Sequence, residues 1–284
     1  MSAQSSAANA GTIDVGGDLT VNRLGFGAMR ITGDGIWGPP RDPEEARRVL
    51  RRAVELGVNF IDTADSYGPD VSEELIAEAL HPYADDLVIA TKGGLTRSGP
   101  NLWDADGRPE HLRAALEGSL RKLRTDTITL YQLHRVDPAV PLEDSVGTLA
   151  ELKAEGKIRH IGVSNFTEEQ LRAAQRITPV VSIQNRYNVD DRGSESLVDL
   201  CEQESIVFLP WAPIQNLDGN AAIERAAKKY EVTPRQIVLA WMLARSSSIL
   251  PIPGTGSVGH LEDNIAAAAI ELSPQEVSDI TRNA

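Results

Sequence analysis

Short apolar runs alternate with longer stretches of helical periodicity along most of this 284-residue chain. Most of the short runs are continuously apolar rather than alternating, which is typical of strands buried on both faces of a parallel sheet. The strands predicted in this way cover residues 24–29, 59–62, 87–91, 128–134, 160–164, 180–184, 206–211 and 249–252.

Helices are predicted between these strands, and several have recognisable start signals. Asp42-Pro43-Glu44-Glu45 combines an acidic N-cap, a proline in the first turn and a glutamate three residues after the cap. Thr233-Pro234 and Ser273-Pro274 begin two further helices in the same manner. The other predicted helical runs are 47–56, 112–123, 142–154, 167–174, 194–204 and 258–268.

Eight strands with helices between them favour a closed (β/α)₈ barrel of the TIM type. A doubly wound open sheet is the alternative, although strand number and length favour the barrel. Gly16-Gly17 separates two short runs, 12–15 and 19–21, so we expect an N-terminal β-hairpin ahead of the barrel. No linker divides the chain. We therefore predict a disordered tail over residues 1–10 and a single domain over residues 11–284.

Composition and charge exclude several classes of protein. The net charge of −13 argues against a nucleic-acid partner, which would need a basic face. The single cysteine, Cys201, excludes an internal disulfide and a thiol-rich metal site, and we interpret it as a buried structural thiol. No apolar run approaches the ~20 residues that span a bilayer, and the first residues lack the features of a signal peptide. We therefore expect a cytoplasmic protein without a membrane partner.

An acid, a phenol, an ammonium and an imidazole lie at or just after the ends of successive predicted strands. They are Asp62, Tyr67, Lys92 and His134. Taken singly, each has a structural explanation as a helix cap, a packed aromatic ring or a core histidine, although a lysine is almost never buried unpaired. Catalytic groups of (β/α)₈ barrels lie at these strand ends, so the combination indicates proton transfer. A phenol has a pKa of about 10, and a nearby ammonium lowers it by stabilising the phenolate.

Several short motifs occur in order at the predicted strand ends. They are Gly25-Phe26-Gly27, Asp62-Thr63-Ala64-Asp65-Ser66-Tyr67-Gly68, Thr91-Lys92, Leu133-His134, Gly162-Val163-Ser164-Asn165 and Ile252-Pro253-Gly254-Thr255. Together they resemble the aldo-keto reductase superfamily from about Gly16 to the C-terminal helix. The resemblance implies NAD(P)H-dependent reduction of an aldehyde or ketone to an alcohol, with hydride from the nicotinamide and a proton from Tyr67. It also implies that Lys92 lowers the pKa of Tyr67, Asp62 pairs with Lys92, and His134 orients or polarises the carbonyl.

The resemblance further implies a dinucleotide that lies extended across the barrel mouth. Ser164, Asn165 and Gln184 match the positions that hold the nicotinamide carboxamide, which needs both donors and acceptors. Helix capping is the alternative for the first two. Trp211 would stack on the nicotinamide, with core packing as the alternative. The remaining implied contacts are Gly27, Ala28, Met29, Ala212, Pro213, Ile214, Gly254, Thr255, Gly256, His260, Asp263 and Asn264.

The cofactor preference depends on the glycine-rich turn at residues 252–258, which leads into a predicted helix and offers an anion site. Gly254 and His260 occupy positions at which one branch of the superfamily has a lysine and an arginine that recognise the 2′-phosphate. Their absence weakens a preference for NADP(H) without reversing it, and NAD(H) remains possible. The segment from Gly25 to Arg30 lacks the third glycine of a Rossmann fingerprint and opens no predicted helix.

Substrate specificity is expected from the loops. The loop at residues 30–40 should overhang the carbonyl, with Trp37 and Trp103 as candidate substrate walls and loop packing as the alternative for both. Residues 35–40 resemble a bacterial branch that includes pyridoxal reductases. An NAD-linked alcohol or pyridoxal dehydrogenase and a slow cofactor-binding redox sensor are the other functions considered. The complete acid–base set favours the enzyme.

Overall fold

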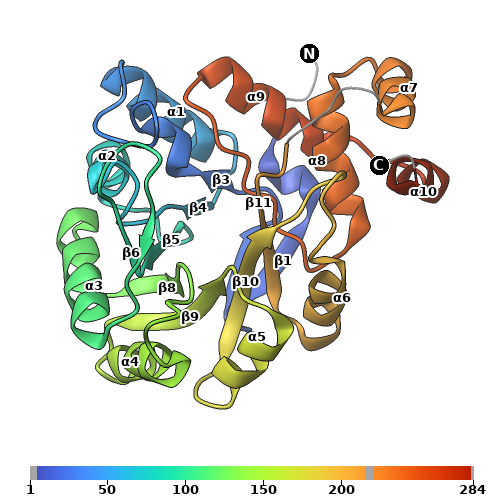
Figure 1. Cartoon of the computed structure of the whole chain (residues 1–284). Helices are drawn as coiled ribbons and strands as arrows, with labels where there is room; N and C mark the ends of the chain where they lie inside the picture. Colours follow the sequence, from blue (N-terminus) through green and yellow to red (C-terminus); the bar gives the residue numbers. More distant parts are fainter. Residues whose placement is uncertain (1–4, 215–219, 283–284) are drawn as a thin grey trace.

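The computed structural model describes residues 5–214 and 220–282. Seven parallel strands form one curled sheet, with helices packed around its outside (Figure 1). Along the sheet the order is β11-β10-β9-β8-β5-β4-β3. The strands are β3 (Phe26–Gly27), β4 (Phe60–Asp62), β5 (Val88–Gly93), β8 (Ile128–Leu133), β9 (Ile158–Ser164), β10 (Val180–Arg186) and β11 (Val207–Trp211).

The barrel closes through a segment that is less regular than the sequence predicts. Leu250 donates its backbone N–H to the carbonyl of Phe208 at 2.9 Å, and Gly25 donates to the carbonyl of Pro251 at 2.9 Å. The predicted strand at 249–252 is thus reduced to one bridge between Phe208 and Ile249. Pro251 and Pro253 have no N–H group, so this segment cannot sustain a hydrogen-bonded ladder.

The predicted first strand, 24–29, is also shorter than expected. It is only two residues long, because Ala28–Ile31 turns into a 3₁₀ helix, η2, that carries the chain outward. The end of β3 packs closely on the closing segment. A Cβ atom added at Gly27 would lie 2.6 Å from the carbonyl oxygen of Ile252, so a side chain at this position is excluded.

The helices begin largely where the sequence signals them. Asp42 caps α1 by accepting from the amides of Glu44 and Glu45, each at 3.0 Å, and Thr233 forms a reciprocal capping box with Gln236. Two helices, α2 and α7, were not predicted. The helices are α1 (Pro43–Glu55), α2 (Val71–Leu80), α3 (Pro109–Leu123), α4 (Leu142–Ala154), α5 (Glu168–Gln175), α6 (Glu195–Glu204), α7 (Ala221–Tyr230), α8 (Pro234–Arg245), α9 (Val258–Ala266) and α10 (Pro274–Arg282).

The predicted N-terminal hairpin is present and closes the bottom of the barrel. It consists of β1 (Thr12–Val15) and β2 (Leu19–Asn22), which pair antiparallel. Val15 and Val21 are fully buried in one cluster with barrel residues such as Phe60 and Leu130. Asp18 at the turn accepts from His160 of β9 at 2.7 Å. The C-terminal end of the barrel is thereby left open for a site.

The N-terminal residues before the hairpin are partly ordered. Ala7–Ala10 forms a 3₁₀ helix, η1, that is capped by Ser6. Ala7 is fully buried and donates its backbone N–H to the carbonyl of Leu56 at 2.8 Å. The prediction of disorder is therefore wrong for these residues, because the free carbonyls at the end of α1 provide partners. Residues 1–4 lie outside the described part of the chain.

Alternation along the strands explains which residues share the barrel interior. Phe60, Ala90 and Leu130 belong to the interior cluster, and successive side chains of a strand point to opposite faces. The residues two positions further along the same three strands therefore face the same interior at its C-terminal end. These residues are Asp62, Lys92 and Gln132.

Two features bear on predictions made from composition. Cys201 of α6 is fully buried, and burial raises the pKa of its thiol to about 12, which agrees with a structural role. In the portion of the chain that the structure covers, no helix has both the length and the apolar character to cross a bilayer.

Candidate active site

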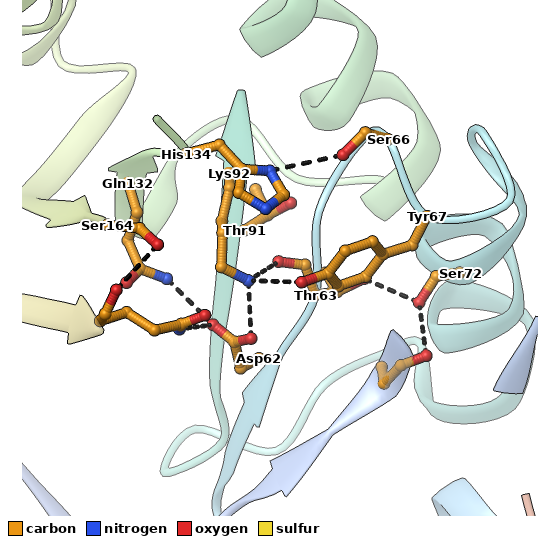
Figure 2. A network of polar contacts seen from close by, with 12 residues as sticks. Asp62, Thr63, Ser66, Tyr67, Ser72, Thr91, Lys92, Gln132, His134 and Ser164 are labelled. Atoms are coloured by element: carbon orange, nitrogen blue, oxygen red, sulfur yellow. Dashed lines mark hydrogen bonds and ion pairs between the residues drawn. The ribbon is translucent and has the colours of Figure 1, made fainter. Parts of the chain in front are cut away.

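A buried lysine organises the polar end of the barrel. Lys92 is fully buried at the end of β5, and its Nζ donates to Asp62 Oδ2 at 2.6 Å, to the carbonyl of Thr63 at 2.8 Å and to Tyr67 Oη at 3.3 Å. Figure 2 shows this ammonium between the carboxylate and the phenol. These acceptors use all the N–H groups of an ammonium, which fixes its position.

Two glutamine side chains hold the carboxylate of Asp62. Its Oδ1 accepts from Gln132 Nε2 at 3.0 Å and from Gln184 Nε2 at 2.9 Å. Gln184 was predicted as a cofactor contact, and its amide N–H is used within the protein. Gln132 was not predicted as a site residue. It lies two positions before His134, so the two side chains point to the same side of the sheet at the end of β8. Together the amides prevent Asp62 from turning away from Lys92.

Burial dominates the proton affinity of Tyr67. Removal from water raises the pKa of the Tyr67 phenol, and the nearby positive charge of Lys92 opposes this only in part. Lys92 thus acts on this pKa in the expected direction, but burial has the larger effect. Burial also works against the charge of Lys92, but Asp62 and Tyr67 outweigh it and the pKa of Lys92 is raised. At neutral pH the pair is therefore a protonated phenol beside a fixed ammonium.

His134 is a neutral imidazole at neutral pH. Burial, reinforced by the positive charge of Lys92, lowers the pKa of His134 well below its usual range. Its Nδ1 lies 3.4 Å from Ser66 Oγ, and its ring meets the Tyr67 ring edge-on with centroids 5.8 Å apart. When Ser66 donates to Nδ1, the Nε2 atom carries the proton. A neutral hydrogen-bond donor then lies beside the phenol.

A single cleft of about 770 Å³ lies over these groups. Four of the implied site residues do not line it: Lys92, Ala28, Asp263 and Trp37. Ile36, which precedes Trp37 in the chain, does line it. Implied residues that do line it are Gly27, Met29, Asp62, Tyr67, Trp103, His134, Ser164, Asn165, Gln184, Trp211, Ala212, Pro213, Ile214, Gly254, Thr255, Gly256, His260 and Asn264. Lining residues that the sequence did not suggest are Arg30, Ile36, Leu95, Asn101, Arg135, Arg235, Ile252 and Pro253.

The groups implied to hold the carboxamide are bonded to one another. Asn165 accepts from Trp211 Nε1 at 3.1 Å and donates to Ser164 Oγ at 3.0 Å. Ser164 in turn donates to the carbonyl of Gln184 at 2.9 Å. Asn165 adopts a left-handed backbone conformation, with φ of 59°, which is uncommon outside glycine. Thr167, rather than Ser164 or Asn165, caps α5, so helix capping does not account for this pair. A carboxamide bound here would exchange with the hydrogen bonds between them.

The anion site expected at the start of α9 is partly filled by the protein. Glu45 of α1 accepts the backbone N–H of Val258 at 3.1 Å, and Thr255 Oγ1 accepts that of Ser257 at 3.1 Å. Three arginines offer positive charge to the cleft, and one of them, Arg135, directly follows His134 in the chain. Arg30 and Arg235 line it and form no ion pair with any described residue. The sequence signal for Arg30 was its location three residues after Gly27, the last residue of the first motif.

A second acidic group lies just outside the cleft. Asp65 belongs to the same loop as Tyr67, and its Oδ1 is shielded from solvent without a hydrogen-bond partner, although the residue as a whole is only half-buried. Burial and the nearby charge of Glu73 raise the pKa of Asp65 well above its usual range. Glu73 itself accepts from Thr91 at 2.6 Å and pairs with Lys122 at 3.0 Å.

We expect Asp65→Asn to stabilise the protein increasingly as pH rises. Unfolded Asp65 loses its proton near pH 4, whereas the folded protein retains it to higher pH, so folding binds a proton and stability declines with pH. Asparagine has no proton to lose in this range, so the variant lacks this decline, which is at most about 1.4 kcal/mol in the free energy of unfolding per pH unit. Thermal melts at pH 5 and pH 8 measure it. Asp86→Asn, at an exposed position, is the control, and a gain that does not change with pH would contradict the prediction.

Comparison with known proteins identifies the family. The model of the aldo/keto reductase family matches residues 23–283. The chain is 48% identical to an uncharacterized oxidoreductase of Schizosaccharomyces pombe over 95% of this chain and 88% of that protein. It is 40% identical to the pyridoxine 4-dehydrogenase of Escherichia coli, over 93% and 95%.

Solved structures agree with this result. A thermostable aldo-keto reductase in complex with the inhibitor epalrestat aligns with a TM-score of 0.84 and 31% identity, covering 96% of this chain and 99% of that one. An aldo-keto reductase from Klebsiella pneumoniae in complex with NADPH gives a TM-score of 0.80 and 29% identity, covering 95% and 94%. The chain belongs to the aldo/keto reductase family of oxidoreductases, which reduce carbonyls with nicotinamide cofactors. The predicted family and TIM-barrel fold are confirmed.

Proposed function

We propose that this protein reduces an aldehyde to an alcohol with NADPH, using Tyr67 as the proton donor. The observation that carries the proposal is the hydroxyl of Tyr67, which faces the cleft and lies 3.3 Å from the buried ammonium of Lys92. A phenol in this environment holds its proton at neutral pH and can deliver it when an acceptor arrives. We expect this activity in the cytoplasm, as the composition predicts.

The cleft suits an extended dinucleotide. Its volume of about 770 Å³ falls in the range of cofactor and ligand sites. Ser164, Asn165 and Trp211 would hold the nicotinamide end, because their amide, hydroxyl and ring groups line the cleft together. Arg30, Arg235 and His260 would hold the phosphate end. When bound there, the nicotinamide supplies the hydride.

The residues of the chain perform the proton transfer. Tyr67 Oη donates its proton to the carbonyl oxygen as negative charge develops on that oxygen, and becomes a phenolate. Lys92 stabilises the phenolate, since its Nζ lies within hydrogen-bond distance of Tyr67 Oη. His134 Nε2 donates a second hydrogen bond to the same oxygen, and such fixed donors stabilise charge in a site that excludes water.

The proposed substrate is an aromatic aldehyde of the pyridoxal type. Two observations support it: the relative that is a pyridoxine 4-dehydrogenase, and the apolar wall formed over Tyr67 by Ile36 and Trp103. A screen of pyridoxal, benzaldehyde and propanal, followed as loss of NADPH absorbance, tests it. We expect kcat/KM for pyridoxal at least tenfold above that for propanal. Equal values for ring and non-ring aldehydes would discard pyridoxal as the substrate.

The preference for NADPH is proposed to depend on Arg235 and Arg30. Each charge-assisted contact to a phosphate is worth about 1.5–3 kcal/mol, or roughly tenfold to a hundredfold in affinity. Arg235→Met should therefore weaken NADPH binding by at least tenfold and NADH binding by less than threefold. Paired Kd titrations measure it. Arg225→Met, which removes an exposed arginine from α7, is the control. Equal losses for both cofactors would show that Arg235 does not recognise the 2′-phosphate.

An NAD-linked dehydrogenase is the second candidate, and one observation favours it. Glu45 occupies the start of α9 with a carboxylate, and hydrogen bonding to the Val258 amide is the main factor that lowers the pKa of Glu45. A negative charge there would repel a 2′-phosphate. Tighter binding of NADH than of NADPH by the wild-type protein would favour this candidate. Glu45→Gln should then shift the preference toward NADPH.

A further inference from the structure

One arginine connects the loops that cover the cleft. Arg97 follows the short strand β6 (Leu95–Thr96), and its guanidinium donates to backbone carbonyls of three separate loops. In the loop of residues 30–40, called the first loop, it donates to the carbonyl oxygens of Ile36 at 2.8 Å and Gly35 at 3.0 Å. In the loop of Tyr67 it donates to the carbonyl oxygen of Ser66 at 2.9 Å. Within its own loop it bonds to Leu102 at 2.7 Å and to Gly99 at 3.3 Å.

The same guanidinium lies over Trp103, an aromatic side chain that lines the cleft. The Cζ atom of Arg97 is 3.6 Å from the centroid of the Trp103 ring and 5.7 Å from that of Trp37. Trp103 in turn meets Tyr67 edge-on, with centroids 6.2 Å apart, and lies 6.4 Å from the ring of His134. Trp103 therefore lies between Arg97 on one side and the rings of Tyr67 and His134 on the other, and Arg97 helps to fix its position.

Arg97 has no acidic partner among the described residues that would explain its location. Every hydrogen bond that it forms ends on a carbonyl oxygen, and burial alone lowers the pKa of its guanidinium. Partly burying a cation without a counter-ion costs free energy, so such a group indicates a requirement other than stability. The planar fork of arginine can serve several carbonyls and an aromatic face together, whereas the single ammonium of lysine cannot.

We propose that Arg97 is a positioning residue that determines specificity for ring-bearing aldehydes by fixing Trp103 and the two neighbouring loops over Tyr67. This inference rests on the proposed function for its substrate class. The wall that Arg97 holds is the apolar surface on which a planar substrate ring would lie. A small aldehyde needs only the phenol and the imidazole, and it should be indifferent to the wall.

The test compares Arg97→Lys and Arg97→Met with wild type on benzaldehyde, pyridoxal and propanal. For the ring aldehydes we expect KM to rise and kcat/KM to fall at least tenfold in both variants. For propanal we expect less than a threefold change, and the Kd of NADPH should change less than twofold. Arg41→Met is the matched control, because Arg41 is exposed and pairs only with Asp34 of the first loop. Equal losses on ring aldehydes and propanal would overturn the proposal, as would wild-type behaviour of Arg97→Lys.

A second measurement separates this proposal from the proposed function. In a Trp103→Ala background, Arg97→Met should reduce kcat/KM for ring aldehydes by less than a further threefold, because both changes remove the same wall. Additive losses would overturn the proposal. Near-UV circular dichroism needs no substrate: Arg97→Met and Trp103→Phe should lose the same tryptophan band. If wild type reduces no aldehyde, the proposed function fails, while an unchanged band in Arg97→Met separately overturns the positioning of Trp103.

Discussion

Replacing Tyr67 with phenylalanine is expected to lower kcat by at least ~10²-fold, within the range of general-acid contributions. The substitution removes only the hydroxyl, which lies 3.3 Å from Lys92, and leaves the ring against Trp103 and His134. NADPH affinity should therefore change less than twofold. Steady-state kinetics with an aldehyde and a Kd titration with NADPH measure the two effects.

The matched control for this substitution is Tyr83→Phe. Tyr83 also donates a hydrogen bond from a partly buried hydroxyl, to the carbonyl of Leu123 at 2.8 Å, but it does not line the cleft. Loss of the Tyr83 hydroxyl should lower the stability of the protein and leave kcat unchanged. Wild-type turnover in Tyr67→Phe would exclude Tyr67 as the acid and require another donor, for which His134, which also lines the cleft, is the candidate.

Lys92→Met is expected to impair both turnover and stability. The phenolate of Tyr67 loses its stabilising charge, so kcat should again fall at least ~10²-fold. In addition, Asp62 remains buried without its cation, and breaking such a pair by removing one partner costs about 3–5 kcal/mol. Urea unfolding together with steady-state kinetics measures both losses.

The double variant Asp62→Asn with Lys92→Met separates the two effects. A neutral asparagine no longer carries an unpaired charge, so a large part of the lost stability should return while kcat stays low. A double variant that is as unstable as Lys92→Met would mean that the ion pair is not the source of the loss. Recovery of kcat would instead show that Lys92 acts only through the fold.

The location of the proposed catalytic residues could be predicted because it follows from local rules. Asp62, Lys92 and His134 each end an apolar run, and parallel strands bring their C-terminal ends to one edge. The N-terminal hairpin was predicted from Gly16-Gly17 for the same reason, since tight turns need such residues. The cap of α7 was also visible in principle. Asn220 accepts from the backbone amides of Ala222 and Ile223 at the start of this helix, and asparagine is a favoured N-cap residue.

Other features had no local signal. The helix α2 follows Asp70, which has a positive φ of 70° and makes no side-chain cap, so nothing in the sequence marks its start. Gln132 resembles any polar residue in a strand until the register sets it against Asp62. Glu45 was expected only as part of a helix start in α1, yet it caps α9 more than two hundred residues away.

The sequence by itself determined the strand–helix order, the parity of each strand and hence the set of polar groups at the barrel mouth, because hydrophobic periodicity and turn chemistry act over a few residues. Only the tertiary structure decided how those groups interact. Lys92 lowers the pKa of Tyr67, but the net shift is upward because burial depends on every neighbour. Arg97 bridges three loops because residues distant in sequence are brought within hydrogen-bond reach. Desolvation and contact between distant segments are properties of the folded chain, and no local pattern encodes them.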